Sequence, residues 1–275
     1  MNVISIIPAR GGSTGIHMKN LIKLDNKPLL YYSVTASLNS KSVSRTVVST
    51  DNDKIADYAQ SLGAEVVIRP KKISGNIVGL EPAILHVLDH FKKHENFKPD
   101  VVITLQNTSP FRNSQHIDRA FSIFKKGNYD SVISGFKSKF LLWGKKGKNV
   151  TPINYNPLKR PRRQEMKKYF IENGAIFITK YSSLKKFKSR VCGTVGVYEM
   201  PHKFSLEIDN LFDLYLARQI FKGEIEELTL NASGETYISD RYEDPGYDHS
   251  FYIFFDLNSK ENVFSISDIT VKSSH

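Results

Sequence analysis

A glycine-rich segment near the start of the chain carries the residues best suited to binding phosphate. It reads Pro8-Ala-Arg-Gly-Gly-Ser-Thr-Gly-Ile-His-Met-Lys-Asn20. Its glycines permit positive φ angles and close backbone approach, so that backbone N–H groups can face phosphate oxygens. The spacing is neither that of a Walker loop nor that of a dinucleotide-binding GxGxxG motif. A tight turn without a ligand is the alternative, but the flanking cations Arg10 and Lys19 favour a triphosphate.

Two carboxylates in the segment Glu207-Ile-Asp209, just before the last predicted helix, are candidates for a metal site. The i, i+2 spacing places both on one side of an extended segment. Two oxygen donors suit Mg²⁺, which keeps part of its water shell and bridges substrate oxygens. The structural alternative is that Asp209 caps the following helix, with Asp213 in its first turn.

The charge of the chain is unevenly distributed. The 275 residues carry a formal net charge of +11, which divides into +20 for residues 1–206 and −9 for residues 207–275. Residues 136–168 alone contain 11 basic side chains and one acidic side chain. Such a block indicates an acidic partner, which could be nucleic acid, an anionic membrane surface, or a phosphorylated or carboxylated substrate.

Composition restricts the class of protein. Hydrophobic residues make up 40% and charged residues 24%, which is ordinary for a globular protein and excludes disorder of the whole chain. A single cysteine, Cys192, excludes an intrachain disulfide and favours a reducing compartment. No apolar run has the length of a membrane helix, and the first residues read as a strand rather than a signal peptide. We expect a soluble cytoplasmic protein that does not bind membranes.

The elements that must position these residues alternate between short apolar strands and amphipathic helices. This alternation predicts an α/β fold with a doubly wound, mostly parallel sheet covered on both faces. Ligands of such sheets bind beyond the carboxyl ends of the strands, where the strand order reverses. The loops 10–20 and 106–112, after the first and fourth strands, are therefore the expected site. Strands are predicted at 3–8, 46–49, 65–68, 101–105, 130–134, 175–179 and 196–199, and helices at 28–39, 54–62 (capped by Asp51), 81–91, 114–124 (capped by Asn113) and 211–221.

Two regions depart from this alternation. Residues 136–168 are rich in Lys, Gly, Pro and Asn and predict an irregular insertion within a first domain that spans residues 1–227. Residues 228–275 form an acidic and aromatic C-terminal extension of unknown role, with strand-like runs at 251–255 and 263–266.

Several collinear motifs resemble the acylneuraminate cytidylyltransferases, the CMP-sialic acid synthetase family. The opening segment, Ile6-Ile-Pro-Ala-Arg-Gly-Gly-Ser-x-Gly-Ile-x-x-Lys-Asn20, carries the strongest resemblance. Further matches follow in order over residues 3–220: Lys27-Pro-Leu29, Val48-Ser-Thr-Asp51, Arg69-Pro70, Leu105-Gln-Asn-Thr-Ser-Pro-Phe-Arg112, Arg160-Pro-Arg-Arg-Gln164, Asn173-Gly-Ala-Ile-Phe177 and Glu207-Ile-Asp209.

The resemblance implies a Rossmann-like nucleotidyltransferase fold and assigns roles within it. Arg10 and Lys19 would grip the phosphates of CTP as catalytic cations, and Gln106 would lie between the nucleotide and a sugar acid. Arg112 would either orient its neighbours or cap a helix on the surface. Mg²⁺ would be held by Asp209 and, with a longer side chain than the family's usual Asp, by Glu207. The remaining nucleotide-binding residues would be Gly11, Gly12, Ser13, Asn20 and Arg69.

The basic insertion has a role in this family as well. The resemblance implies that residues 136–170 help to form a homodimer and reach toward the neighbouring active site. An acidic sugar carries a carboxylate, for which arginine is a bidentate partner. Arg162 and Arg163 are therefore expected to contact either the sugar substrate or the second subunit, whereas the lysines between 137 and 148 are expected to face solvent.

The implied activity is the coupling of CTP to a sialic-acid-like nonulosonic acid for surface glycan biosynthesis, with release of pyrophosphate. Three departures from the family pattern keep alternatives open: residues 14, 17 and 18 lack the usual basic and proline residues, segment 75–82 differs from a nucleotide-contacting pattern, and Glu207 replaces Asp. The alternatives are activation of an octulosonate or a diamino-nonulosonate, or nucleotide binding without turnover. A nucleic-acid partner is not expected, because no aromatic-interleaved motif accompanies the basic block.

Overall fold

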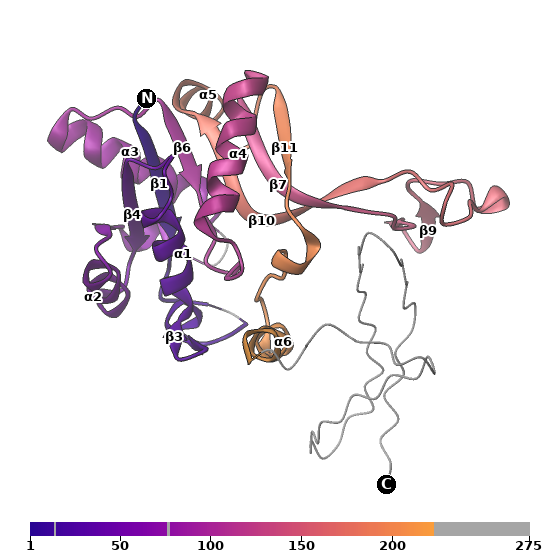
Figure 1. The fold of residues 1–275 in the computed structure, drawn as a ribbon, viewed down its shortest axis with the longest axis horizontal. Coiled ribbons are helices and arrows are strands. Elements are labelled where there is room, and N and C mark those ends of the chain that lie inside the picture. Colours follow the sequence, from indigo (N-terminus) through magenta and orange to yellow (C-terminus); the bar gives the residue numbers. More distant parts are fainter. Residues whose placement is uncertain (14, 76–77, 223–275) are drawn as a thin grey trace, which may run out of the picture. The chain divides into compact units, whose positions relative to one another are not determined.

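The computed structural model describes residues 1–13, 15–75 and 78–222. Its main feature is a seven-stranded sheet of order β11-β7-β10-β6-β1-β4-β5 (Figure 1). All neighbouring strands are parallel except β10, which is antiparallel to both β6 and β7. The strands are β1 (Val3–Pro8), β4 (Arg45–Thr50), β5 (Glu65–Ile68), β6 (Val101–Thr104), β7 (Ser131–Ser138), β10 (Tyr169–Lys180) and β11 (Val195–Glu199). The predicted doubly wound, mostly parallel sheet is confirmed.

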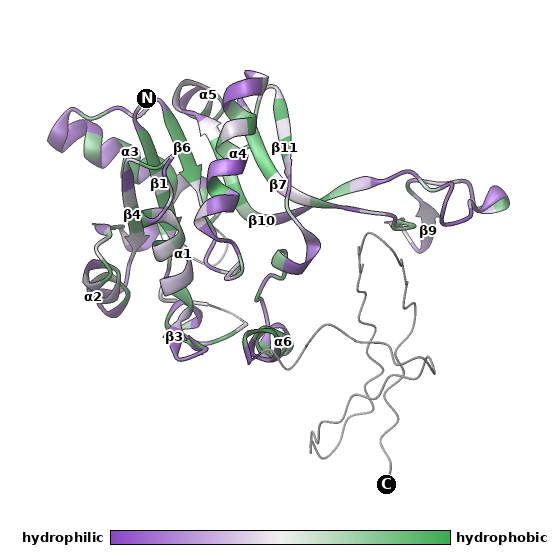
Figure 2. Ribbon diagram, viewed as in Figure 1, coloured by the Kyte–Doolittle hydropathy of each residue, from purple (hydrophilic) through white to green (hydrophobic). Residues whose placement is uncertain are grey.

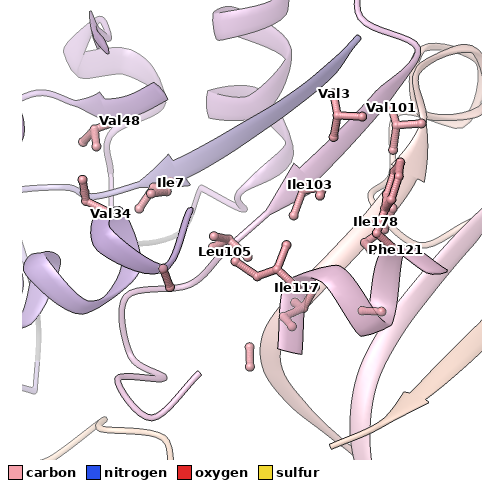
Figure 3. Packing of buried hydrophobic residues seen from close by; sticks show 14 of the residues in the cluster. Val3, Ile7, Val34, Val48, Val101, Ile103, Leu105, Ile117, Phe121 and Ile178 are labelled. Carbon is pink, nitrogen blue, oxygen red and sulfur yellow. The ribbon is translucent and has the colours of Figure 1, made fainter. Parts of the chain in front are cut away.

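Helices cover both faces of this sheet because successive strand residues point to opposite sides. Ile4 and Ile6 of β1 pack with α3 and α5, whereas Val3 and Ile7 pack with α1, α2 and α4. Figure 3 shows the cluster that contains Val3 and Ile7. Figure 2 shows that hydrophobic residues are concentrated in the strands of the sheet. The helices are α1 (Leu29–Leu38), α2 (Asp53–Ser61), α3 (Glu81–Glu95), α4 (Ser114–Gly127), α5 (Tyr181–Phe187) and α6 (Leu211–Lys222).

The strand order reverses at β1. The chain runs from β1 outward through β4 to β5, and then returns to place β6 on the other side of β1. In the register, Ile6 is paired with Val47 of β4 and with Thr104 of β6. The loops after β1 and β6 therefore leave the sheet side by side, as predicted for a ligand site at a topological switch point.

Two helix starts were predicted from single polar residues, and one prediction is wrong. Asn113 caps α4, and its Oδ1 accepts the N–H of His116 at 3.1 Å. Helix α2 is capped by Asn52, whose Oδ1 accepts the N–H of Ile55, and not by Asp51. Asp51 serves a different purpose, because its carboxylate binds the backbone of the glycine-rich loop.

The basic insertion is more regular than predicted. Strands β7 and β10 continue past the sheet as an antiparallel pair, with Ser138 opposite Tyr169. They carry a hairpin formed by β8 (Trp143–Lys146) and β9 (Asn149–Pro152), which turns at Gly147 with a φ of 62°. Figure 1 shows that this projection, residues 136–170, extends away from the seven-stranded sheet. We call it the arm.

Two remaining segments complete the description. A small antiparallel pair, β2 (Lys23–Leu24) and β3 (Lys27–Pro28), precedes α1, and short 3₁₀ turns occur at Lys19–Leu21, Lys71–Ile73, Pro157–Lys159 and His202–Phe204. The C-terminal extension 228–275, with its predicted strands at 251–255 and 263–266, lies outside the described residues. Within the part that is described, no helix is both long enough and apolar enough to cross a bilayer.

Candidate functional site

The glycine-rich loop is anchored to the sheet by side chains from two other segments and by one of its own. Gly11 donates its N–H to Asp51 Oδ1 at 2.9 Å. Asn20, at the far end of the loop, donates from Nδ2 to the Arg10 carbonyl at 2.8 Å and accepts from Asn107 Nδ2 at 3.1 Å. The loop is thus closed on itself and tied to the ends of β4 and β6, which fixes its backbone at the switch point.

Three cations surround this loop. Arg10 donates from Nη1 to the Gly75 carbonyl at 2.9 Å. Lys19 Nζ donates to the Ile208 carbonyl at 2.9 Å and to Asp209 Oδ1 at 3.0 Å. Arg69 is buried, and desolvation lowers its pKa, partly offset by the nearby charge of Asp51. The structure therefore brings together Arg10, Lys19, Asn20 and Arg69, as the sequence predicted, beside the backbone of residues 11–13.

Two buried polar atoms next to this loop have no hydrogen-bond partner in the described part of the chain: Nε of Arg69 and Oδ1 of Asn107. Buried polar groups of native proteins are nearly always paired with protein, water or ligand. Both atoms belong to residues that border the loop, so the unpaired donor and acceptor fit a site made for a polar ligand.

Asp209 lies against the same loop. A Cβ on Gly15 would stand 2.3 Å from the Asp209 carbonyl oxygen, so the close approach requires glycine at position 15. The carboxylate of Asp209 is 65% exposed and forms the ion pair with Lys19. The alternative that Asp209 caps α6 is wrong, because Asn210 Oδ1 accepts the N–H of Asp213 and acts as the cap.

Gln106 lies near the Glu207-Ile-Asp209 segment, beside a bulge in β10. The pairing of β10 with β7 shifts register between Glu172 and Phe177. Asn173 holds this bulge, accepting from Ser134 Oγ at 2.6 Å and donating to Ser205 Oγ at 2.9 Å. The next residue, Gly174, has a φ of 63°, and a Cβ there would stand 3.4 Å from Gln106 Nε2. The bulge thus carries the backbone up to the Gln106 amide.

Glu207 is placed at the same bulge. Its Oε1 accepts from Thr108 Oγ1 at 2.8 Å and would stand 3.0 Å from a Cβ on Gly174. Burial raises the pKa of the Glu207 carboxyl, and the Thr108 hydrogen bond opposes that shift. The two carboxylates of the Glu207-Ile-Asp209 segment therefore have different partners, which the spacing alone did not predict.

The donor set can be compared with what Mg²⁺ requires. Across residues 1–13, 15–75 and 78–222, no three His, Cys, Asp or Glu side chains are grouped so that they could hold a metal ion. Mg²⁺ in nucleotide enzymes commonly uses one or two carboxylates, with water and substrate phosphates as the other ligands. The exposed carboxylate of Asp209, beside a loop suited to phosphate, fits that mode of binding.

Arg112 orients its neighbours from inside the protein. It is 1% exposed, and its Nε donates to the Ala175 carbonyl at 3.3 Å. Its Nη2 donates to Ser33 Oγ at 2.7 Å and to the Gln106 carbonyl at 3.2 Å. Desolvation lowers the pKa of this guanidinium to about 9. The alternative of a surface arginine is wrong, and Arg112 instead joins α1, the loop of Gln106 and the bulge of β10.

The structure does not bring Arg162 and Arg163 to this site within one chain. Both side chains are exposed on the arm. Within the described residues, their hydrogen bonds are backbone ones: the Arg162 N–H donates to Glu165, and the Arg163 carbonyl accepts from Lys139. Their predicted contact with a sugar substrate or a second subunit stays a prediction.

Sequence reasoning gave no role in the site to several residues that shape it, although they lie within the matched motifs: Asp51, Asn107, Thr108, Asn173 and Gly174. Asp51 and Thr108 each follow the end of a parallel strand, and this position is the signal that could have identified them. The Asn-Gly pair at 173–174 is a turn signal that predicts a left-handed residue inside a strand.

Comparison with known proteins shows the family of this chain. A sequence profile of the cytidylyltransferase family matches residues 4–240. The chain belongs to the cytidylyltransferase family. An N-acylneuraminate cytidylyltransferase of Escherichia coli O18:K1:H7 is 31% identical over 282 aligned positions, which cover 98% of this chain and 60% of the relative. N-acylneuraminate cytidylyltransferase A of Danio rerio is 31% identical, over 79% of this chain and 50% of the relative. The chain therefore spans about half to three fifths of the length of these relatives.

The fold is also shared with a solved structure. A CMP:2-keto-3-deoxy-manno-octonic acid synthetase in complex with CTP superimposes with a TM-score of 0.61. The two sequences are 14% identical, and the match covers 82% of this chain and all of the other. At this identity the likeness concerns the fold, and it confirms the Rossmann-like nucleotidyltransferase architecture.

Proposed function

We propose that this cytidylyltransferase couples CTP to a sialic-acid-like nonulosonic acid. The anomeric hydroxyl oxygen attacks the α-phosphorus, so that one O–P bond forms while the bond from the α-phosphorus to the bridging oxygen breaks. The products are a CMP-sugar and pyrophosphate, and the hydroxyl proton is lost to solvent. The observation that carries this proposal is the meeting of the cation-flanked loop with Gln106 and Asp209 at the switch point, in a chain of this family.

The residues of the loop would act mainly by positioning and by neutralising charge. Arg10 and Lys19 would bind the CTP phosphates together with the backbone of Gly11, Gly12 and Ser13, while Asn20 and Arg69 hold the nucleotide. Lys19 would exchange its contact with Asp209 for a phosphate oxygen. Gln106 would stand between the nucleotide and the sugar acid. Such preorganised charge supplies much of the catalysis of phosphoryl and nucleotidyl transfer.

Asp209 is the residue that would hold Mg²⁺. When bound, Mg²⁺ would neutralise negative charge on the phosphates of CTP and on the leaving pyrophosphate. Asp209 is suited to this because its carboxylate is exposed at the loop, and it would be released when Lys19 turns to a phosphate oxygen. The carboxylate of Glu207 instead accepts a hydrogen bond from Thr108.

The proposal is tested by pyrophosphate release from CTP with Mg²⁺ and a panel of sugar acids: N-acetylneuraminate, an octulosonate and a diamino-nonulosonate. We expect release with N-acetylneuraminate or a close nonulosonic acid, and none with ATP or GTP. Release with the octulosonate alone would contradict the sugar assignment. CTP binding without release for any sugar acid would instead support a nucleotide-binding protein without turnover. Tight, salt-dependent RNA binding that CTP does not affect would show instead that the basic arm binds a polyanion.

We also propose that the chain works as a homodimer joined through the arm, with Arg162 and Arg163 directed at the partner or its substrate. In support, the arm exposes several apolar side chains, and Leu158 is 93% exposed. Large exposed apolar groups on a projecting hairpin are typical of an interface. Sedimentation of Leu158→Ser with Ile153→Ser should show a shift toward monomer, whereas an unchanged dimer, or a monomeric parent protein, would contradict the assignment.

The product would supply an activated acidic sugar for a surface glycan. We place the reaction in the cytoplasm, a reducing compartment that suits a chain with one cysteine.

A further inference from the structure

The two carboxylates of the Glu207-Ile-Asp209 segment are directed at different parts of the site. Asp209 is exposed and contacts Lys19 of the phosphate-binding loop. Glu207 is partly buried and accepts a hydrogen bond from Thr108, two residues after Gln106 in the loop after β6. One carboxylate thus belongs to the end of the site that suits the triphosphate, and the other to the end formed by β6 and β10.

The surroundings of Glu207 form a small polar niche. Its Oε1 and Gln106 Nε2 both lie within 3.4 Å of the point where a Cβ on Gly174 would stand. Within the described residues, Oε2 of Glu207 and the side-chain amide of Gln106 make no hydrogen bond of their own. The niche therefore brings the Glu207 carboxylate and the Gln106 amide together at Gly174, where any side chain would crowd both groups.

We propose that Glu207 is a sugar-binding residue and not a ligand of Mg²⁺. Held by Thr108, its carboxylate accepts a hydrogen bond from a hydroxyl or amide N–H group of the sugar, while Gln106 donates to a neighbouring sugar oxygen. Asp209 alone supplies the protein's carboxylate to the metal. This inference rests on the proposed function and assigns the part of the sugar that this niche receives.

The charge of Glu207 also constrains how the sugar is oriented. A carboxylate of the substrate placed near Glu207 would be repelled in this poorly solvated niche. The sugar must therefore direct its hydroxyl or acylamino groups at Glu207 and its own carboxylate elsewhere, toward a cation. The extra methylene of Glu compared with Asp lets the side chain reach Thr108 and the bulge of β10 from position 207.

The decisive experiment compares Glu207→Gln with Asp209→Asn in two measurements on the full chain. The first is Mn²⁺ binding in the presence of CTP, followed by electron paramagnetic resonance, with no turnover required. We expect Asp209→Asn to weaken Mn²⁺ binding by about 10-fold or more, and Glu207→Gln to leave it within about 2-fold. The second is the KM for N-acetylneuraminate, which Glu207→Gln should raise by about 10- to 100-fold with the KM for CTP unchanged.

A third variant, Glu207→Asp, separates the two roles further. Asp keeps the charge and could still ligate a metal, but it is too short to keep the Thr108 contact and reach the sugar. We therefore expect Glu207→Asp to retain Mn²⁺ binding and to raise the KM for the sugar about as much as Glu207→Gln does.

Two outcomes would overturn the inference while the proposed function stands. One is a loss of Mn²⁺ binding in Glu207→Gln as large as in Asp209→Asn. The other is an active Glu207→Gln protein with an unchanged KM for the sugar. Failure of the proposed function is recognised separately, because the parent protein would then release no pyrophosphate with any sugar acid and would show no sugar binding by calorimetry.

Discussion

Basic side chains at the switch point and basic side chains on the arm differ in how they are held. At the switch point Lys19 is ion-paired with Asp209, Arg69 is buried, and Arg112 is fully enclosed. On the arm, side chains such as Lys145 and Lys148 are exposed to solvent. Removing a cation from water costs free energy, so it persists only where other contacts compensate. Enclosed cations therefore gather at the proposed site, whereas the larger number of cations on the arm stays in solvent.

The strongest test of this comparison is Arg112→Ala. The substitution removes a large buried side chain and leaves the carbonyls of Gln106 and Ala175 without their donor, so we expect unfolding free energy to fall by about 3–5 kcal/mol. Urea denaturation measures this loss. The matched control is Arg163→Ala on the arm, which should change stability by less than about 0.5 kcal/mol. Equal losses for the two variants would remove the distinction between enclosed and exposed cations.

Lys19→Ala tests the phosphate-binding assignment. We expect kcat/KM for CTP to fall by about 10²–10³-fold, because a charge that stabilises the transferring phosphate is lost. The measurement is pyrophosphate release at saturating sugar acid. Lys23→Ala, at an exposed lysine on β2 close in sequence, is the control and should retain full turnover. Activity of Lys19→Ala equal to that of the control would show that Lys19 only anchors Asp209.

His116 in α4 offers a pH-dependent test of the enclosed region. Burial, with a smaller contribution from Arg119, lowers its pKa to about 4. Its Nδ1 accepts the N–H of Asn113, which requires an unprotonated nitrogen. The unfolded chain binds a proton near pH 6.5 and the folded chain does not until about pH 4, so stability falls as the pH decreases between these values.

This contribution is roughly 1 kcal/mol once solvent screening is allowed for. Thermal or urea unfolding of the parent protein and His116→Gln, compared from pH 7 to pH 4.5, measures it. Gln can keep the reciprocal cap with Asn113, so the difference in stability between the two proteins should narrow as the pH falls. A pH-independent difference would show that His116 is not linked to folding in this range.

The smallest effect is expected on the arm. Replacing Lys145, Lys146 and Lys148 together with Gln should change unfolding free energy by less than about 0.5 kcal/mol and turnover by less than about 2-fold, because exposed charges contribute little. Pyrophosphate release and urea denaturation provide both readouts. A large loss of turnover would mean that these lysines contact substrate or a partner's site, and the exposed cations would then share the function of the enclosed ones.

Much of the sheet and its edge could be predicted from local patterns. Apolar runs such as Val3–Pro8 and Val101–Thr104 predict buried strands, and the polar loops after them were correctly expected to meet. The cap at Asn113 also follows from a single residue. These features depend on neighbours a few positions apart, so the sequence alone contains the information.

Long-range contacts were harder to predict. The role of Asp51 depends on Gly11, 40 residues away, and a helix cap was the better local explanation. The antiparallel β10, with its bulge between Glu172 and Phe177, has the local pattern of a shorter strand at 175–179. The hairpin on the arm has few apolar residues in its strands and reads as a loop.

The sequence by itself determined the alternation of strands and helices, the glycine-rich loop with its two cations, and the resemblance that placed the chain in its family. Each of these depends on residue type and local spacing. Only the tertiary structure decided which charged side chains are buried. It also decided that Arg112 donates to the Gln106 carbonyl, and that Glu207 contacts Thr108 while Asp209 contacts Lys19. The reason is physical: burial and hydrogen-bond partners arise from segments about 60 to 190 residues apart, which no local pattern encodes.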